Sequence, residues 1–222
     1  MKTKLLWWCL WLSLLLGCGG VEHRRRTFPV EAGSQPITGT NDFGWSVNVA
    51  TAKVRVEAVR FYTGKVLITR EWRFDPYVLI GGSAWAHPGH YVAGEALGEL
   101  LTPVDVDLLA PAPVELGVAQ AVTGDYGSLE LTVTGAQVTG TATKGAQTVT
   151  FDSTAYSPEK ALEGVKFEKV LRDEEGRVHL DVKLSTWLAR IDFATPFTAN
   201  GEAYNGFVRG IQDTSAYEVS WK

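Results

Sequence analysis

Apolar and polar side chains alternate along several short segments of this chain, a pattern typical of half-buried β-strands. In residues 178–184 every second side chain is apolar, which predicts one face turned to a core. The intervening residues, which we expect to face solvent, are His179, Asp181 and Lys183. Residues 52–62 alternate too, but the apolar phase slips near Ala58, which predicts a β-bulge. Residues 104–109 and 216–221 predict two further strands.

Threonine- and valine-rich runs separated by glycines predict more strands over residues 128–153. Residues 164–185 predict a hairpin that turns at residues 173–176. Helix signals are short: residues 157–164 begin with Ser-Pro and end at a glycine, and residues 184–193 have room for one or two turns. Many short strands with few helices predict a mainly β fold, an antiparallel β-sandwich or open barrel with one or two short helices.

The first residues have the three-part layout of a secretory signal peptide. Lys2 and Lys4 precede an apolar run over residues 5–16, and small residues follow it. The run is about 12 residues long, whereas a helix needs ~20 apolar residues to span a bilayer. A signal peptide over residues 1–17 is therefore favoured over a transmembrane anchor.

The end of this run, Leu15-Leu16-Gly17-Cys18, resembles the lipobox of bacterial lipoproteins, although Leu16 is bulkier than the small residue usual there. The resemblance implies cleavage before Cys18, acylation of Cys18, and a lipid-anchored mature chain in the bacterial cell envelope. Gly19, rather than an aspartate, follows Cys18. By resemblance to the common sorting pattern this implies the outer membrane, at its periplasmic face or at the cell surface.

Cys9 lies within the signal, so the mature chain keeps no second thiol for a disulfide. Residues 18–36 are rich in Gly, Arg, Pro and Ser without apolar periodicity, which predicts a lipidated flexible tether. Residues 37–222 are then expected to form a single β-domain. The basic cluster of residues 23–26 beside Cys18 suits contact with anionic head groups, or is simply a solvated linker.

The charge balance argues against a nucleic-acid partner. Loss of Lys2 and Lys4 with the signal takes the formal net charge from −4 to −6, so the mature chain has no broad basic field. It has no P-loop, no dinucleotide fingerprint and no G-x-S-x-G elbow. We therefore expect a binding protein rather than an enzyme, with a hydrolase as the weaker alternative.

Residues 87–90 read His-Pro-Gly-His, and Pro followed by Gly favours a type II turn. Such a turn brings the Cα atoms of its ends within ~7 Å, so His87 and His90 could bind one copper or zinc ion. A zinc site needs further ligands, for which the candidates are His179, Glu95, Glu99, Asp105 and Asp107. Trp85 and Tyr91 would line this site. The alternative interpretation is a structural turn whose histidines bond to the backbone.

Residues 59–68, VRFYTGKVLI, resemble a strand pair of copper-binding periplasmic proteins of the methanobactin-partner type. Trp85-Ala86-His87 resembles the tryptophan-x-histidine of related copper proteins whose tryptophan is oxidised to kynurenine. The resemblance implies a copper site at Trp85 and His87, but a second family histidine has no match here. Two functions stay open: an envelope protein that binds copper or zinc, and an accessory lipoprotein that holds a protein partner without metal.

Overall fold

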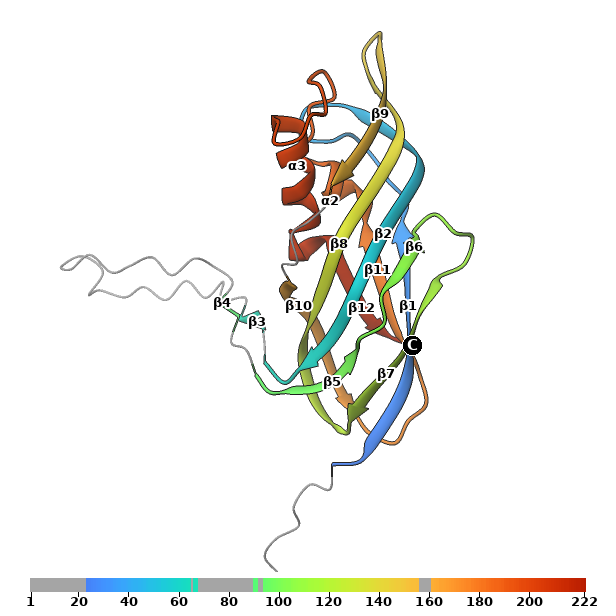
Figure 1. Ribbon diagram of the computed structural model, residues 1–222, viewed down its shortest axis with the longest axis vertical. Coiled ribbons are helices and arrows are strands. Elements are labelled where there is room, and N and C mark those ends of the chain that lie inside the picture. The colour runs from blue at the N-terminus through green and yellow to red at the C-terminus, as the bar shows by residue number, and fades with distance from the viewer. Residues whose placement is uncertain (1–22, 65, 68–89, 92–93, 156–160) are drawn as a thin grey trace, which may run out of the picture.

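The computed structural model describes residues 23–64, 66–67, 90–91, 94–155 and 161–222 (Figure 1). These residues form a ten-stranded mixed sheet, a separate two-stranded ladder and short helices, which confirms the predicted mainly β fold. The strands are β1 (Arg25–Gln35), β2 (Ser46–Tyr62), β3 (Val66–Leu67), β4 (His90–Tyr91), β5 (Ala96–Leu100), β6 (Val104–Asp107), β7 (Val114–Val122), β8 (Gly124–Lys144), β9 (Gln147–Ala155), β10 (Ala161–Leu171), β11 (Val178–Lys183) and β12 (Tyr217–Trp221). The helices are α2 (Leu184–Leu188), α3 (Glu202–Ile211) and the 3₁₀ helix η3 (Thr214–Ala216).

The large sheet runs in the order β10-β8-β2-β5-β7-β1-β11-β12, with β6 added to β2 and β9 added to β8. Among the described strands only β1 and β11 pair in parallel, and the other neighbours are antiparallel. The sheet curves until its two end strands approach each other, since Lys169 Nζ of β10 lies 5.0 Å from the ring centroid of Trp221 in β12. It is not a closed barrel.

The concave side of the sheet holds the core. Alternate residues of β1, Phe28, Val30 and Ala32, are buried there. Phe61 contacts Phe28 edge-on at 5.4 Å between ring centroids. Helices α2 and α3 pack beside the half of the sheet opposite the start of β1 (Figure 1). Within the described residues no helix combines the length and apolar character needed to span a membrane.

The predicted flexible tether is wrong from Arg25 to Gln35, because these residues form β1 between β7 and β11. The chain is fixed to the body even before the strand begins. His23 Nδ1 lies 2.9 Å from the carbonyl oxygen of Thr123, and the Thr123 amide donates to the Arg24 carbonyl at 2.8 Å. Arg26 adds a 2.9 Å ion pair with Asp173. The folded body therefore includes residues 23–35, which the prediction assigned to the tether.

Of four other local predictions, two are confirmed and two are wrong. The bulge near Ala58 is confirmed by a register shift between Val56 and Ala58 against β8, and the helical turns in residues 184–193 are confirmed by α2. The hairpin over residues 164–185 is wrong, because β10 pairs with β8 whereas β11 pairs with β1 and β12. The helix over residues 157–164 is wrong where the structure describes it, since residues 161–164 open β10.

Candidate functional site

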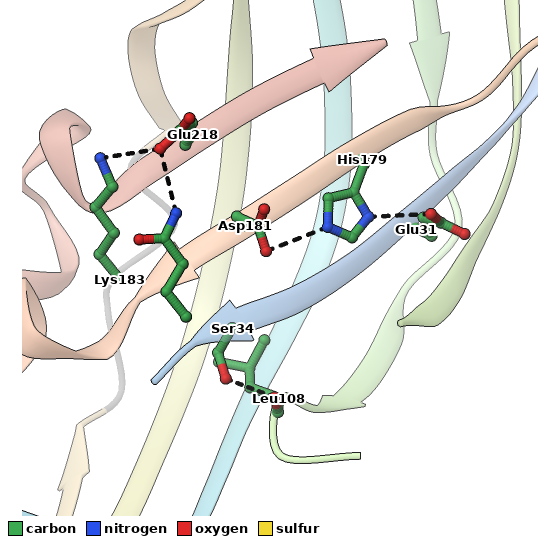
Figure 2. Close-up of polar contacts among 8 residues, drawn as sticks. Glu31, Ser34, Leu108, His179, Asp181, Lys183 and Glu218 are labelled. Atoms are coloured by element: carbon green, nitrogen blue, oxygen red, sulfur yellow. Dashed lines mark hydrogen bonds and ion pairs between the residues drawn. The ribbon is translucent and has the colours of Figure 1, made fainter. Parts of the chain in front are cut away.

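His179 of β11, one of the candidate ligands, is buried (Figure 2). Its side chain lies on the outer face of the sheet, as the alternation predicts, yet the residue is only 4% exposed. Nδ1 lies 3.0 Å from Glu31 Oε1 of β1, and Nε2 lies 3.2 Å from Asp181 Oδ1. The expectation of a solvated His179 is therefore wrong, because two carboxylates bracket the imidazole ring.

The parallel register of β1 and β11 determines which residues of β1 lie beside the His179 imidazole. Glu31 lies opposite His179, and Gly33 lies opposite Asp181. A Cβ on Gly33 would lie 3.9 Å from His179 Cε1 and 4.0 Å from Asp181 Oδ1, so even the smallest side chain there would be in contact with both groups. Both distances are ordinary van der Waals contacts, so a Cβ at residue 33 would not displace the imidazole.

The groups around Glu31 lower the pKa of its carboxyl group. Arg177 Nη1 donates to Glu31 Oε2 at 3.1 Å. Burial raises the pKa of Glu31, but the hydrogen bonds and positive charges of Arg177 and His179 lower it more, and the net pKa lies below its usual value. Each ring nitrogen of His179 faces one carboxylate, Glu31 on one side and Asp181 on the other.

A second polar group continues along the same face (Figure 2). Glu218 of β12 accepts from Lys183 Nζ at 3.3 Å and from Gln35 Nε2 at 3.2 Å, and these contacts lower its pKa. Ser34 Oγ donates to the Leu108 carbonyl oxygen at 2.7 Å. Ion pairs thus tie β1, β11 and β12 together. They hold strands in register, and with both ring nitrogens occupied His179 is poorly placed to bind an ion or to exchange a proton with a substrate.

The structure does not gather the predicted metal ligands around His179. His90 and Tyr91 form β4, where they pair with Leu67 and Val66 of β3. Trp85 and His87 lie outside the described residues, as does Cys18. Glu95 follows this ladder in the chain, and its backbone amide donates to Thr63 Oγ1 at 3.0 Å. Glu99 is in β5 opposite Arg60. In the ranges that the structure describes, no group of three His, Cys, Asp or Glu residues could hold a metal ion.

The start of β1 and the end of β2 lie at the same end of the sheet. Arg26 pairs with Ala121, Ala121 with Gly98, and Gly98 with Phe61, so these four residues form one row across β1, β7, β5 and β2. Three strand spacings separate the two ends, about 14 Å along the sheet. The β3–β4 ladder follows β2 directly and returns to β5. The start of β1 and the end of β2 that leads into the ladder therefore lie at the same end of the sheet.

Glu31, Gly33 and Arg177 are the polar-site residues that the sequence pattern missed. Residue 31 lies in the segment taken for a tether, and its partner His179 is 148 positions away, so no local spacing joins them. The one available signal is the apolar alternation of residues 28–32, which marks Glu31 as an outward residue of a strand. Family models, curated proteins and solved structures give no match to this chain. None of these comparisons indicates an enzymatic activity.

Proposed function

We propose that the protein is a lipid-anchored binding protein of the bacterial cell envelope, acylated at Cys18 and held at the outer membrane. The observation that carries this proposal is the apolar run that ends in Leu15-Leu16-Gly17-Cys18, a few residues before the folded body. His23 is already bonded to the β7–β8 connection through Thr123. Five residue steps therefore separate Cys18 from the body, and an extended chain spans at most about 18 Å over that length.

This short connection supports a specific orientation. An acylated Cys18 would hold the sheet end that contains Arg26 and Phe61 close to the head groups. The β3–β4 ladder leaves from that end, so the segment with His87 and His90 would act near the membrane surface. The proposed role is binding rather than catalysis, and an envelope protein is a possible partner.

The anchor is tested by replacing Cys18 with alanine. We expect the wild-type chain to incorporate labelled palmitate and to sediment with membranes, and the Cys18→Ala variant to do neither, because several acyl chains hold a protein far more firmly than one. Cys9→Ala is the matched control, since Cys9 lies within the apolar run and is removed with it. Palmitate labelling that persists without Cys18 would contradict the proposal.

The sharper form of the proposal is binding of copper or zinc by His87 and His90, with Trp85 and Tyr91 beside the ion. We expect the mature chain to bind one ion at about pH 7.5 and to lose affinity toward about pH 5, because imidazole takes up a proton over this range and only its neutral form is a ligand. His87→Ala or His90→Ala should each weaken binding more than about tenfold. Replacing Pro88 should weaken it less, since both ligands remain.

His23→Ala is the control for this titration, because His23 is exposed and lies beside Thr123 rather than in the turn. Isothermal titration with each ion, together with elemental analysis of the purified protein, measures the affinity and the stoichiometry. If the wild-type chain shows no saturable binding, the His-Pro-Gly-His turn is structural and the accessory lipoprotein without metal is the better description.

A further inference from the structure

An open pocket of about 580 Å³ lies at the end of the sheet where the described chain begins. Of the described chain, three segments line it: residues 23–24 before β1, residues 123–125 where β8 begins, and residues 170–173 where β10 ends. His23, one of the lining residues, is five residue steps from Cys18. The anchor proposed at Cys18 would bring this pocket to the membrane surface, and our inference about its ligand rests on that anchor.

Arginine side chains from the start of β1 fix one wall of the pocket. Arg26 Nε donates to the Arg172 carbonyl oxygen at 3.3 Å, and Arg26 Nη2 lies 2.9 Å from Asp173 Oδ1. Arg24 Nη1 lies 3.4 Å from Asp173 Oδ2. Each oxygen of the Asp173 carboxylate therefore already has a cationic partner, and Asp173 is poorly placed to bind a positively charged group of a ligand.

Two other charged side chains of the pocket have no partner within the described part of the chain. The Asp125 carboxylate and the Arg172 guanidinium are exposed, and neither makes an ion pair or a side-chain hydrogen bond there. Asp125 lies opposite Val170 in the β8–β10 ladder, and Arg172 is two residues beyond Val170. Their Cα atoms are therefore at most about 13 Å apart. Opposite charges that line one pocket without touching each other leave room for a ligand that carries both charges.

The chemistry of these groups indicates the class of ligand. A guanidinium donates paired hydrogen bonds to a phosphate, and a primary ammonium group donates to a carboxylate. Val170 is 50% exposed and lies on the same face as Asp125, so an apolar side chain lies beside the two charges. We propose that this pocket binds the zwitterionic head group of a membrane phospholipid, with its phosphate at Arg172, its primary ammonium group at Asp125 and the start of its acyl chains at Val170.

The test uses residues 18–222 with Cys18→Ala, a chain that contains every described residue and needs no acylation. Soluble dihexanoyl phosphatidylethanolamine is compared with dihexanoyl phosphatidylcholine, whose trimethylammonium group has the same charge but no N–H donor. NMR titration of the Gly124 and Val170 amide signals gives both dissociation constants. We expect the phosphatidylethanolamine to bind roughly fivefold more tightly, the size of a typical net hydrogen bond, and Asp125→Asn to bring this ratio to about one.

A second pair of variants tests the location. Arg172→Gln should weaken the binding of both lipids about fivefold, because the phosphate loses its charged donor. Arg25→Gln is the matched control, since Arg25 is exposed at the same end of the sheet but does not line this pocket. It should leave both affinities unchanged. Free O-phosphoethanolamine should bind more weakly than the phosphatidylethanolamine, because it has no acyl chain to contact Val170.

The proposal is overturned if the phosphatidylethanolamine shows no saturable binding, or if its advantage survives in Asp125→Asn. Equal effects of Arg25→Gln and Arg172→Gln would also overturn it, because they would indicate diffuse attraction to the basic end of the sheet. If free O-phosphoethanolamine binds as tightly as the lipid, the assignment to a lipid is wrong. Failure of palmitate labelling at Cys18 contradicts the anchor instead, so the two failures are distinguishable.

Discussion

Replacing Glu31 with glutamine is expected to lower the free energy of unfolding by about 2 kcal/mol at pH 7. Glutamine keeps the shape of the side chain but removes the negative charge that faces Arg177 and His179. The Glu31 side chain is 14% exposed and that of His179 is 5% exposed, so water replaces the lost interaction poorly. Removing one partner of a fully buried pair costs ~3–5 kcal/mol, and the partial exposure of Arg177 and Asp181 reduces this figure here.

The control is Glu115→Gln on the neighbouring strand β7. Glu115 lies opposite Glu31 in the sheet but is exposed, so its replacement should change the free energy of unfolding by less than about 0.5 kcal/mol. Urea unfolding followed by tryptophan fluorescence measures both variants. Equal effects of the two substitutions would show that the Glu31–His179–Asp181 contacts contribute no more than a surface charge does.

The effect of Glu31→Gln should depend on pH in a defined direction. The pKa of Glu31 is lower in the folded protein than its ordinary value, so the folded state favours the ionised form. The resulting stabilisation is fully present above the unfolded-state pKa, ~4.3, and is lost as the pH falls through the folded-state pKa. The difference between wild type and Glu31→Gln should therefore be large at pH 7 and smaller at about pH 3. A difference that stays constant over this range would contradict the charge argument.

The strands were predictable because their signal is local, but the order of strands in the sheet was not. Residues 178–184 alternate clearly, and they form a strand with the expected buried face. The turn at residues 173–176 suggested a hairpin, since consecutive strands are usually neighbours. Instead β11 pairs in parallel with β1, whose residues lie 148 positions earlier along the chain. Contacts between such distant residues leave no period or spacing in one sequence.

The same limit explains the errors at the candidate site. Alternation places His179 on the outer face, but its contacts with Glu31 depend on the neighbouring strand β1, which the sequence did not reveal. That strand was missed because it contains Pro29 and Gly33, and both residue types are disfavoured in strands. The His-Pro-Gly-His turn rests on a local sequence signal and lies largely outside the described residues, so both the turn and its metal binding stay predictions.

Helix α3 was missed for a related reason, and its glycines lead to the second large effect. Gly206 and Gly210 lower the helix propensity of residues 202–211. Both glycines are buried against the end of α2. A Cβ on Gly206 would lie far inside van der Waals contact with the carbonyl oxygen of Arg190, which is backbone and cannot rotate away. The two glycines therefore permit the close approach of α3 to the α2–α3 connection.

Gly206→Ala is expected to lower the free energy of unfolding by about 2 kcal/mol or more, because overpacking a tight interior costs ~1–3 kcal/mol and the clash here is with backbone. A loss of stability would be informative, because replacing glycine with alanine inside an unobstructed helix raises the stability by ~1 kcal/mol instead. Arg209→Ala is the control on the exposed side of the same helix and should change the free energy of unfolding by less than about 0.5 kcal/mol. Urea unfolding measures both variants, and far-UV circular dichroism shows whether they keep the helix. A Gly206→Ala protein as stable as wild type would mean that α3 does not approach Arg190 closely.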